Sequence, residues 1–292
     1  MENSSNISSL IIETINTIFH NLFSSIDTNL YDILDELTFI NSDILSDKYF
    51  GKIFGTSASN GILLISNSLL IGFILYFAVK YLSSNFTYSK IENPVQFFLK
   101  LVIYGICMNC SYFLIEQVLD INSYISEIIK SIGEDLFKQN ICFSNLINNI
   151  NNNLKVNDDN LNIFSIDGLI KSTMTISLLN LVTAYALRYI MVKIFILLSP
   201  FAILSLCLEN TSWFFKLWYK NLFSLLFIQI IVSIILLILF SIDYSSSNLF
   251  SKFIYIGGIY ALIKSNSFVR EFLGGVSTEI SQNVGNFSKF LK

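Results

Sequence analysis

The amino-acid sequence predicts an all-α integral membrane protein with about five transmembrane helices. Of its 292 residues, 53% are hydrophobic and only 13% are charged, and the mean hydropathy is +0.62. A soluble domain carries about 25% charged residues, so this chain lacks the polar surface that water requires. Several uncharged stretches are also long enough to cross the hydrocarbon core of a bilayer, which takes about 20 apolar residues.

The composition excludes several classes of function. The net charge of −3 provides no basic surface for sequence-specific nucleic-acid binding. The single histidine, His20, excludes histidine-cluster metal sites and any catalytic triad that needs a histidine. Four cysteines are too few for a disulfide scaffold in so long a chain. We therefore expect a protein that is not an enzyme, with no catalytic, cofactor-binding or metal-binding residue and no cofactor.

Residues 1–60 are expected to form an amphipathic helical head outside the cytoplasm. Residues 1–47 contain no Lys or Arg, so the basic start of a signal peptide is not visible. Apolar residues recur there in steps of three and four, which is the periodicity of a helix: Ile7, Ile11, Ile15, Ile18, Leu22, Ile26, Leu30, Ile33 and Leu37. This stripe packs either on the protein's own transmembrane helices or against the membrane interface or another subunit.

The first two transmembrane helices are expected within residues 61–118. Gly61–Leu82 and Val95–Glu116 are both apolar and of spanning length. Residues 119–168 are then expected to form a long extracytoplasmic loop, amphipathic at its start and rich in Asn over Asn148–Asn162.

Residues 169–267 are expected to hold the third to fifth spans, with a broken segment at 198–220. Two interpretations of Leu169–Leu208 are open. In one, two short spans turn near Arg188. In the other, one span ends near Arg188, and a broken or re-entrant helix near Ser199-Pro200 returns to the same side of the membrane.

The distribution of Lys and Arg favours the second interpretation. With five spans and the N-terminus outside, eleven of the 18 basic residues are cytoplasmic, against six in the alternative. The later spans are Asn221–Ile242 and Phe253–Lys264, of which the second is long enough only if its helix continues toward Phe268. The C-terminus is then inside, and residues 268–292 form a cytoplasmic amphipathic tail.

The candidate functional residues are charged residues, polar residues within the spans, residues at a helix break, and glycines. Arg188 and Lys193 lie near membrane depth, where an ionisable group is either functional or extends to the interface. The five-span topology assigns them to a cytoplasmic basic rim: Arg188, Lys193, Lys216, Lys220 and Arg270. The other candidates are a helix break (Ser199, Pro200, Phe201), intramembrane polar residues (Asn109, Asn180, Gln229) and glycines for close helix packing (Gly257, Gly258, Gly274, Gly275).

A series of motifs in the C-terminal half resembles one known family. The series comprises Leu197–Ala202 (LLSPFA), Phe214–Trp218 (FFKLW), Gln229 in an Ile/Leu-rich span, Ile259–Lys264 (IYALIK) and Val269–Gly275 (VREFLGG). Together these resemble the TrbL-type family, the polytopic inner-membrane subunit of conjugative type IV secretion systems. The resemblance covers residues 170–280, whereas the N-terminal part matches only in layout.

The resemblance implies a channel or scaffold subunit in the bacterial cytoplasmic membrane. Such a subunit contacts membrane lipid and forms homo-oligomers. It links a secretion ATPase to extracytoplasmic channel components. It comes into transient contact with the translocated single-stranded DNA and its attached relaxase. Two alternatives are a small-solute secondary transporter, which usually shows internal repeats and broken helices in both halves, and a membrane immunity or pore-forming protein.

Overall fold

Every regular element in the described part of the chain is a helix. The computed structural model describes residues 13–15, 17–18, 30–31, 33–55, 60–87, 93–153, 166–242 and 249–274. The helices are α2 (Asp43–Ser46), α3 (Lys48–Phe54), α4 (Gly61–Thr87), α5 (Pro94–Asn109), α6 (Ser111–Phe137), α7 (Phe143–Asn153), α8 (Ile166–Leu197), α9 (Ser199–Leu204), η1 (Ser205–Cys207), η2 (Glu209–Thr211), α10 (Ser212–Phe240) and α11 (Leu249–Leu273). The predicted all-α class is confirmed.

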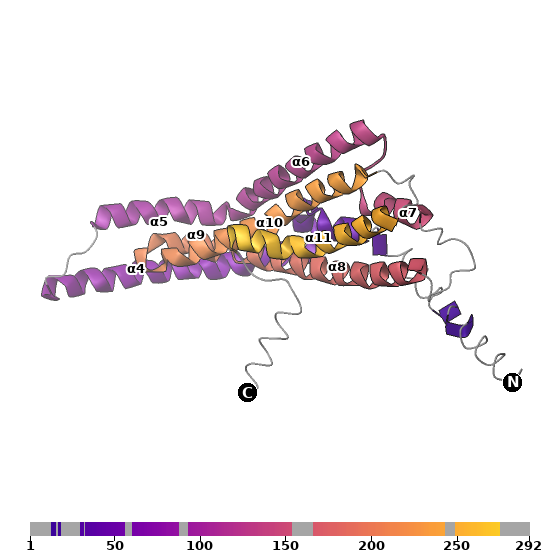
Figure 1. The fold of residues 1–292 in the computed structure, drawn as a ribbon. Coiled ribbons are helices and arrows are strands. Elements are labelled where there is room, and N and C mark those ends of the chain that lie inside the picture. The colour runs from indigo at the N-terminus through magenta and orange to yellow at the C-terminus, as the bar shows by residue number, and fades with distance from the viewer. Residues whose placement is uncertain are drawn as a thin grey trace, which may run out of the picture.

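Helix α10 is the centre of the bundle (Figure 1). It contacts α6, α8 and α11 along its length and α9 near its start. Its sequence is apolar nearly all round after Lys220 because neighbours cover it on several sides. The described residues pack into one large core around it, which includes Leu225, Val232 and Leu236.

Three helices are long and apolar enough to cross a membrane. They are Gly61–Ser84, Gly168–Leu197 and Glu209–Phe240, and the bent pair α5–α6 brings the number to four if the pair forms one span. Helix α11, which contains the expected fifth span, is not among them. The protein is therefore a membrane-embedded helical protein, and the five-span topology stays a prediction.

Helices α4 and α5 form an antiparallel hairpin at one end of the molecule (Figure 1). Pro94 occupies the first turn of α5, where its missing N–H costs nothing, and the side chain of Asn93 caps that helix. The rings of Phe77 and Phe97 stack 3.8 Å apart between the two helices. Most of the remaining surface of α4 is apolar and exposed, as expected for contact with lipid.

The expected span over Val95–Glu116 is not straight. The chain bends by 60° at Cys110, between α5 and α6, because the two helices pack against different neighbours. Helix α5 contacts α4 and α9, whereas α6 lies along α10. The amphipathic start expected for the 119–168 connection forms the rest of α6, which continues to Phe137 and is followed by α7; the extracytoplasmic position of the connection stays a prediction.

Residues 33–54, here called the N-terminal segment, insert one set of side chains into the bundle, whereas Ile33, Tyr49 and Ile53 are exposed. Leu34, Ile40 and Phe54 are each at most 2% exposed. The hydroxyl of Tyr112 on α6 donates to the carbonyl of Leu45 at 3.1 Å. These residues therefore pack on the protein's own helices, which is one of the arrangements expected for the N-terminal stripe, and the extracytoplasmic position of residues 1–60 stays a prediction. Most of the remaining part of the expected stripe lies outside the described residues.

Candidate functional site: a buried polar centre

Arg188 lies in the middle of the bundle and is completely buried. Its Nε donates to the carbonyl oxygen of Leu225 on α10 at 2.8 Å. Its Nη1 donates to the carbonyl oxygen of Thr38 in the N-terminal segment, also at 2.8 Å. The prediction of an exposed position on a cytoplasmic rim is wrong for Arg188. Helix α8 neither turns nor ends there but continues to Leu197, so the guanidinium faces other helices.

Gln229 holds the N-terminal segment from the next turn of α10. Its Oε1 accepts from the backbone N–H of Ile40 and from Nδ2 of Asn122 on α6, both at 3.1 Å. Ile40 follows the helical turn 33–38, so its N–H needs an acceptor outside that turn. Gln229 is 0% exposed and joins three parts of the chain.

Tyr185 extends this polar group toward α11. It lies one turn before Arg188 on α8 and is completely buried. Its hydroxyl donates to the carbonyl of Leu262 at 3.2 Å and lies 3.4 Å from Oγ of Ser265. Together, Arg188, Gln229, Asn122, Thr38 and Tyr185 are here called the polar centre. It connects α6, α8, α10, α11 and the N-terminal segment.

The polar centre carries a fixed positive charge and has hydrogen-bonding capacity left over. A guanidinium keeps its proton in proteins, so Arg188 remains a cation in these apolar surroundings. Nη2 of Arg188 and Nε2 of Gln229 have no hydrogen-bond partner among the residues that the structure describes. Both atoms are donors, and donors left over near a buried cation favour a negatively charged or electron-rich neighbour.

Lys193 and Asp47, which the five-span topology assigns to opposite sides of the membrane, are in contact. Lys193 was assigned to the cytoplasmic rim and Asp47 to the extracytoplasmic head, yet Nζ and Oδ2 are 3.3 Å apart. The two assignments cannot both hold. The backbone N–H of Tyr49, together with Lys193, lowers the pKa of Asp47. Asp47 also caps helix α3 through that N–H.

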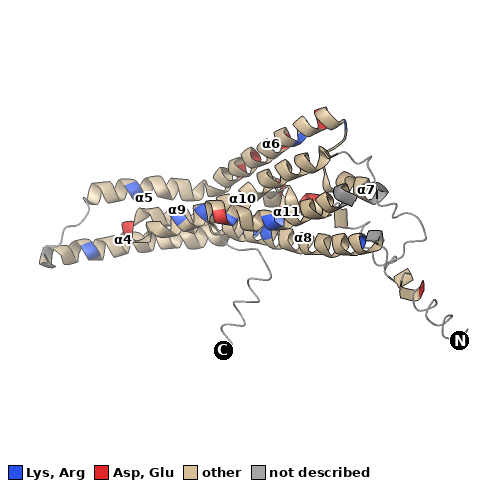
Figure 2. Cartoon of the chain, viewed as in Figure 1, with Lys and Arg blue, Asp and Glu red and all other residues tan. Residues whose placement is uncertain are grey.

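The other predicted rim residues are not gathered around Arg188. Lys216 and Lys220 are exposed on the first turns of α10, and Arg270 is partly buried near the end of α11. In Figure 2, basic residues are scattered along α4, α5, the start of α10 and the end of α11, whereas acidic residues are frequent on α6. The Lys220 side chain lies beside Gly274, four residues after Arg270, so these two charges share one region of the surface that does not include the buried Arg188.

A helix break occurs at the predicted Pro200. Helix α8 ends at Leu197, and α9 begins at Ser199 with Pro200 in its first turn, where no backbone donor is required. Ser199 and Pro200 are buried and Phe201 is partly buried, and α9 contacts both α4 and α5. The chain then turns through η1 and η2, where the hydroxyl of Thr211 donates to the carbonyl of Ser205 at 2.7 Å.

The predicted intramembrane polar residues have three different environments. Asn109 exchanges reciprocal side-chain hydrogen bonds with Asn67 on α4, at 3.1 and 3.2 Å. Gln229 belongs to the polar centre. Asn180 is exposed on α8 and faces away from the bundle. Interhelical side-chain bonds of this kind contribute about 0.6 kcal/mol each on average in membrane proteins.

The predicted glycines also differ from one another. A Cβ at Gly258 would lie 2.2 Å from Leu239 of α10, so this glycine permits close packing. A Cβ at Gly257 would meet nothing within 4 Å, so the prediction of close packing is wrong there. Gly274 has a φ of +70° and lies directly after the last residue of α11, and Gly275 lies outside the described residues. Sequence reasoning missed Gly133, which lets α6 approach Leu237.

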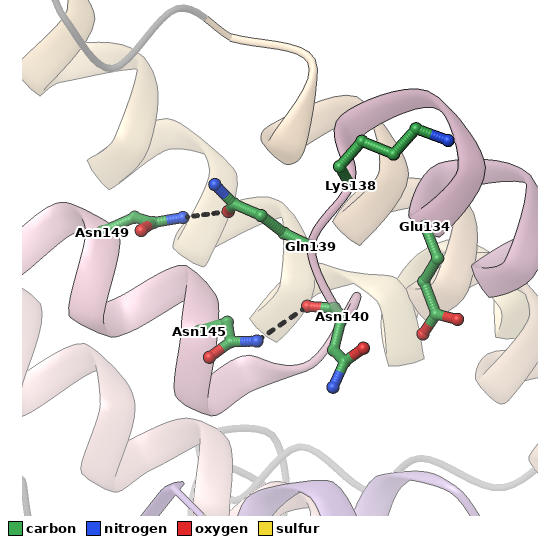
Figure 3. A pocket seen from close by; sticks show the side chains of 6 residues that line it. All are labelled: Glu134, Lys138, Gln139, Asn140, Asn145 and Asn149. Carbon is green, nitrogen blue, oxygen red and sulfur yellow. Dashed lines mark hydrogen bonds between the residues drawn. The ribbon is translucent and has the colours of Figure 1, made fainter.

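A second polar feature is a shallow pocket of about 430 Å³ at the end of α6 (Figure 3). It is lined by Glu134, Lys138, Gln139, Asn140, Asn145 and Asn149. The side chain of Asn149 donates to Gln139 at 3.0 Å, and that of Asn145 donates to the carbonyl of Asn140 at 3.1 Å. These bonds hold α7 to the end of α6, and the amide groups make this end of the molecule hydrophilic.

The comparisons with known proteins identify no relative of this chain. No family model matches the sequence, and no curated protein matches it. The resemblance to the TrbL-type family therefore rests on the motifs of residues 170–280 alone. The contacts of the described helices are the remaining basis for a functional proposal.

Proposed function

We propose that this protein is a membrane-embedded channel or scaffold subunit of a conjugative type IV secretion system. In this role it helps to move single-stranded DNA with its attached protein across the bacterial cytoplasmic membrane. It does so as one of several copies, in contact with a secretion ATPase and with extracytoplasmic channel components. The motifs of residues 170–280 support the family, and the closed interior of the bundle supports the mode of action.

The closed interior is the observation that carries the proposal. Arg188, Tyr185 and Gln229 are 0% exposed, and the N-terminal segment fills the space between their helices. A chain closed in this way offers a passage at its outer surface, between copies, rather than through its own centre. The large exposed apolar surfaces of α4 and α5 provide area for lipid, and that of α6 provides area for contacts between copies.

The test is a mating assay with the gene deleted and then restored in the donor. We expect deletion to abolish plasmid transfer without affecting plasmid replication, and the wild-type gene to restore transfer. A Pro200→Ala variant should reduce transfer more than it reduces the amount of protein, because α9 lies buried between α4 and α5. Unchanged transfer after deletion would refute the proposal.

The buried Arg188 favours a second candidate, a secondary transporter for a small anionic solute. Charged residues inside a membrane bundle often mark a substrate path. A transporter of this kind should accumulate a labelled anion in proteoliposomes that contain only this protein. An Arg188→Gln variant should abolish that uptake, whereas the exposed Lys216→Gln should not. If plasmid transfer depends on the gene and the proteoliposomes take up no anion, the result supports the secretion subunit over the transporter.

A further inference from the structure

One face of helix α6 carries an apolar stripe that the bundle leaves uncovered. The stripe consists of Leu114, Val118, Ile121, Ile125, Ile128 and Ile132, and each side chain is between 40% and 60% exposed. The face of α6 that adjoins this stripe on one side is buried against α10: Ser111, Ile115, Leu119, Asn122, Ser126 and Gly133. In Figure 1, α6 leans outward from the line of α5 and lies at the edge of the molecule.

The spacing of the stripe is that of a coiled coil. Its members follow one another in steps of four, three, four, three and four residues, which repeats every seven. The first core position of each repeat holds a β-branched residue, namely Val118, Ile125 and Ile132. The second holds Leu114, Ile121 and Ile128. Such residues interlock in parallel coiled coils, and isoleucine at both positions, as in most of this stripe, is typical of assemblies of three or four helices.

The charges of α6 argue against lipid as the cover for this stripe. The helix carries six ionisable residues among its 27: Glu116, Asp120, Glu127, Lys130, Glu134 and Asp135. It does not qualify as a membrane span without α5. Glu127 is exposed on the face of α6 away from the stripe, and an acidic group in the hydrocarbon core costs about 2.5–3.5 kcal/mol, so hydrocarbon does not surround this helix. The amide-rich pocket at the end of α6 also indicates an aqueous setting.

The same charges leave room for an identical helix. The positions that flank the stripe are uncharged, namely Gln117, Tyr124 and Ser131 on one side and Ile115, Asn122 and Ile129 on the other. The ionisable residues occupy the remaining positions of the repeat as far as Glu134. Lys130 points to the N-terminal segment, where its Nζ lies 3.0 Å from the centre of the Phe39 ring. Two copies of α6 therefore meet without like charges at the flanking positions.

We propose that the α6 stripe is a self-association surface, and that its partner is the α6 stripe of a second copy of this chain. Copies inserted in one membrane share their orientation, so their α6 helices run parallel and their core positions lie at equal heights. This inference rests on the proposed role as an assembled subunit and names its contact surface. It is distinct from the subunit contact considered for the stripe within Ile7–Leu37, of which Ile18 and Ile33 are 58% and 45% exposed.

Cysteine crosslinking of the full-length protein in native membranes tests the proposal. The four native cysteines, Cys107, Cys110, Cys142 and Cys207, are first replaced by Ala. Single cysteines are then introduced as Ile125→Cys and Ile128→Cys on the stripe, and as Glu127→Cys on the same helix but off the stripe. On oxidation we expect the two stripe variants to form disulfide dimers at least tenfold more than Glu127→Cys.

A second measurement does not depend on crosslinking. The purified protein should show a mass of more than one chain in detergent, and the double variant Ile125→Asp/Ile128→Asp should show the mass of one chain. These side chains are exposed, so the melting temperature of the variant should match that of the control Glu127→Gln. If the variant fails to fold, the crosslinking pattern alone decides.

The outcomes separate the two proposals. Oligomers with equal crosslinking on and off the stripe overturn the α6 surface but leave an assembled subunit intact. A strictly monomeric protein overturns both. If the Ile125→Cys variant forms crosslinks only to a different protein, the proposal that the partner is a second copy of this chain is wrong.

Discussion

Replacing Gln229 by Leu should release the N-terminal segment from the bundle. The two side chains have similar volumes, so the variant removes an acceptor without opening a large cavity. It leaves two buried donors without their acceptor, the N–H of Ile40 and the amide of Asn122, both of which bond Oε1 at 3.1 Å. Asn180→Leu is the matched control, because Asn180 is exposed.

The expected magnitude follows from the single bond to Ile40. Losing this bond costs about 0.6 kcal/mol if it resembles an average interhelical hydrogen bond in a membrane protein. The cost rises to about 3 kcal/mol if the buried N–H of Ile40 is left without any acceptor. Since about 1.4 kcal/mol corresponds to a factor of ten, the amide of Ile40 should exchange roughly 3- to 150-fold faster with deuterium. Mass spectrometry of the peptide that contains residues 33–45 measures this rate.

The comparison between the two variants is the decisive measurement. Asn180→Leu should leave exchange in the N-terminal segment unchanged. Equal exchange in wild type and Gln229→Leu would refute the reasoning, because the segment would then be held without the hydrogen bond to Gln229. Faster exchange in every helix of Gln229→Leu would also refute it, since the predicted opening is local.

Three further predictions concern packing and ionisation. Gly258→Ala should destabilise the protein by about 1–3 kcal/mol, because the added methyl group overpacks against α10. Gly257→Ala should be neutral or stabilising by up to about 1 kcal/mol, because its methyl group would face open space. Thermal unfolding of the two variants measures the difference. Burial raises the pKa of the Cys142 thiol, so at pH 7.5 a maleimide should label it more slowly in the folded protein than in the protein unfolded in SDS. The pKa of Asp47 is lowered, so its contribution to stability is present above the carboxyl's ordinary pKa and is lost as the pH falls through the lowered value. The difference in melting temperature between wild type and Asp47→Asn should therefore be present at pH 7 and vanish in strong acid, and a difference independent of pH would exclude the ion pair with Lys193 as its cause.

Local chemistry explains what the sequence could predict. The apolar runs of α4 and α10 are long enough to be recognised without knowledge of their neighbours. Pro200 predicts a helix break because the missing N–H and the ring act within a single turn. Asn109 was recognised as polar within an apolar helix, although its partner Asn67 lies 42 residues away.

Contacts between distant parts of the chain explain what it could not. Arg188 has the sequence surroundings of a residue at an interface, and its burial depends on partners 37 and 150 residues away. The bend at Cys110 has no Pro or Gly at that position and follows from a change of packing partner. The apolar periodicity of Ile121–Ile132 predicts an amphipathic stretch, but the burial of the neighbouring face of α6 against α10 depends on residues about 100 positions away.

The enclosed N-terminal segment has a consequence for biosynthesis. Ile40 is separated by 189 residues from the glutamine that accepts its N–H, and Thr38 by 150 residues from its arginine. At translation rates of about 5–20 residues per second, the segment waits about 10–40 s on the ribosome before α10 is complete. During that time its apolar side chains need shelter from insertion machinery or a chaperone. Synonymous codons that slow translation between α3 and α10 should then increase degradation of the nascent protein.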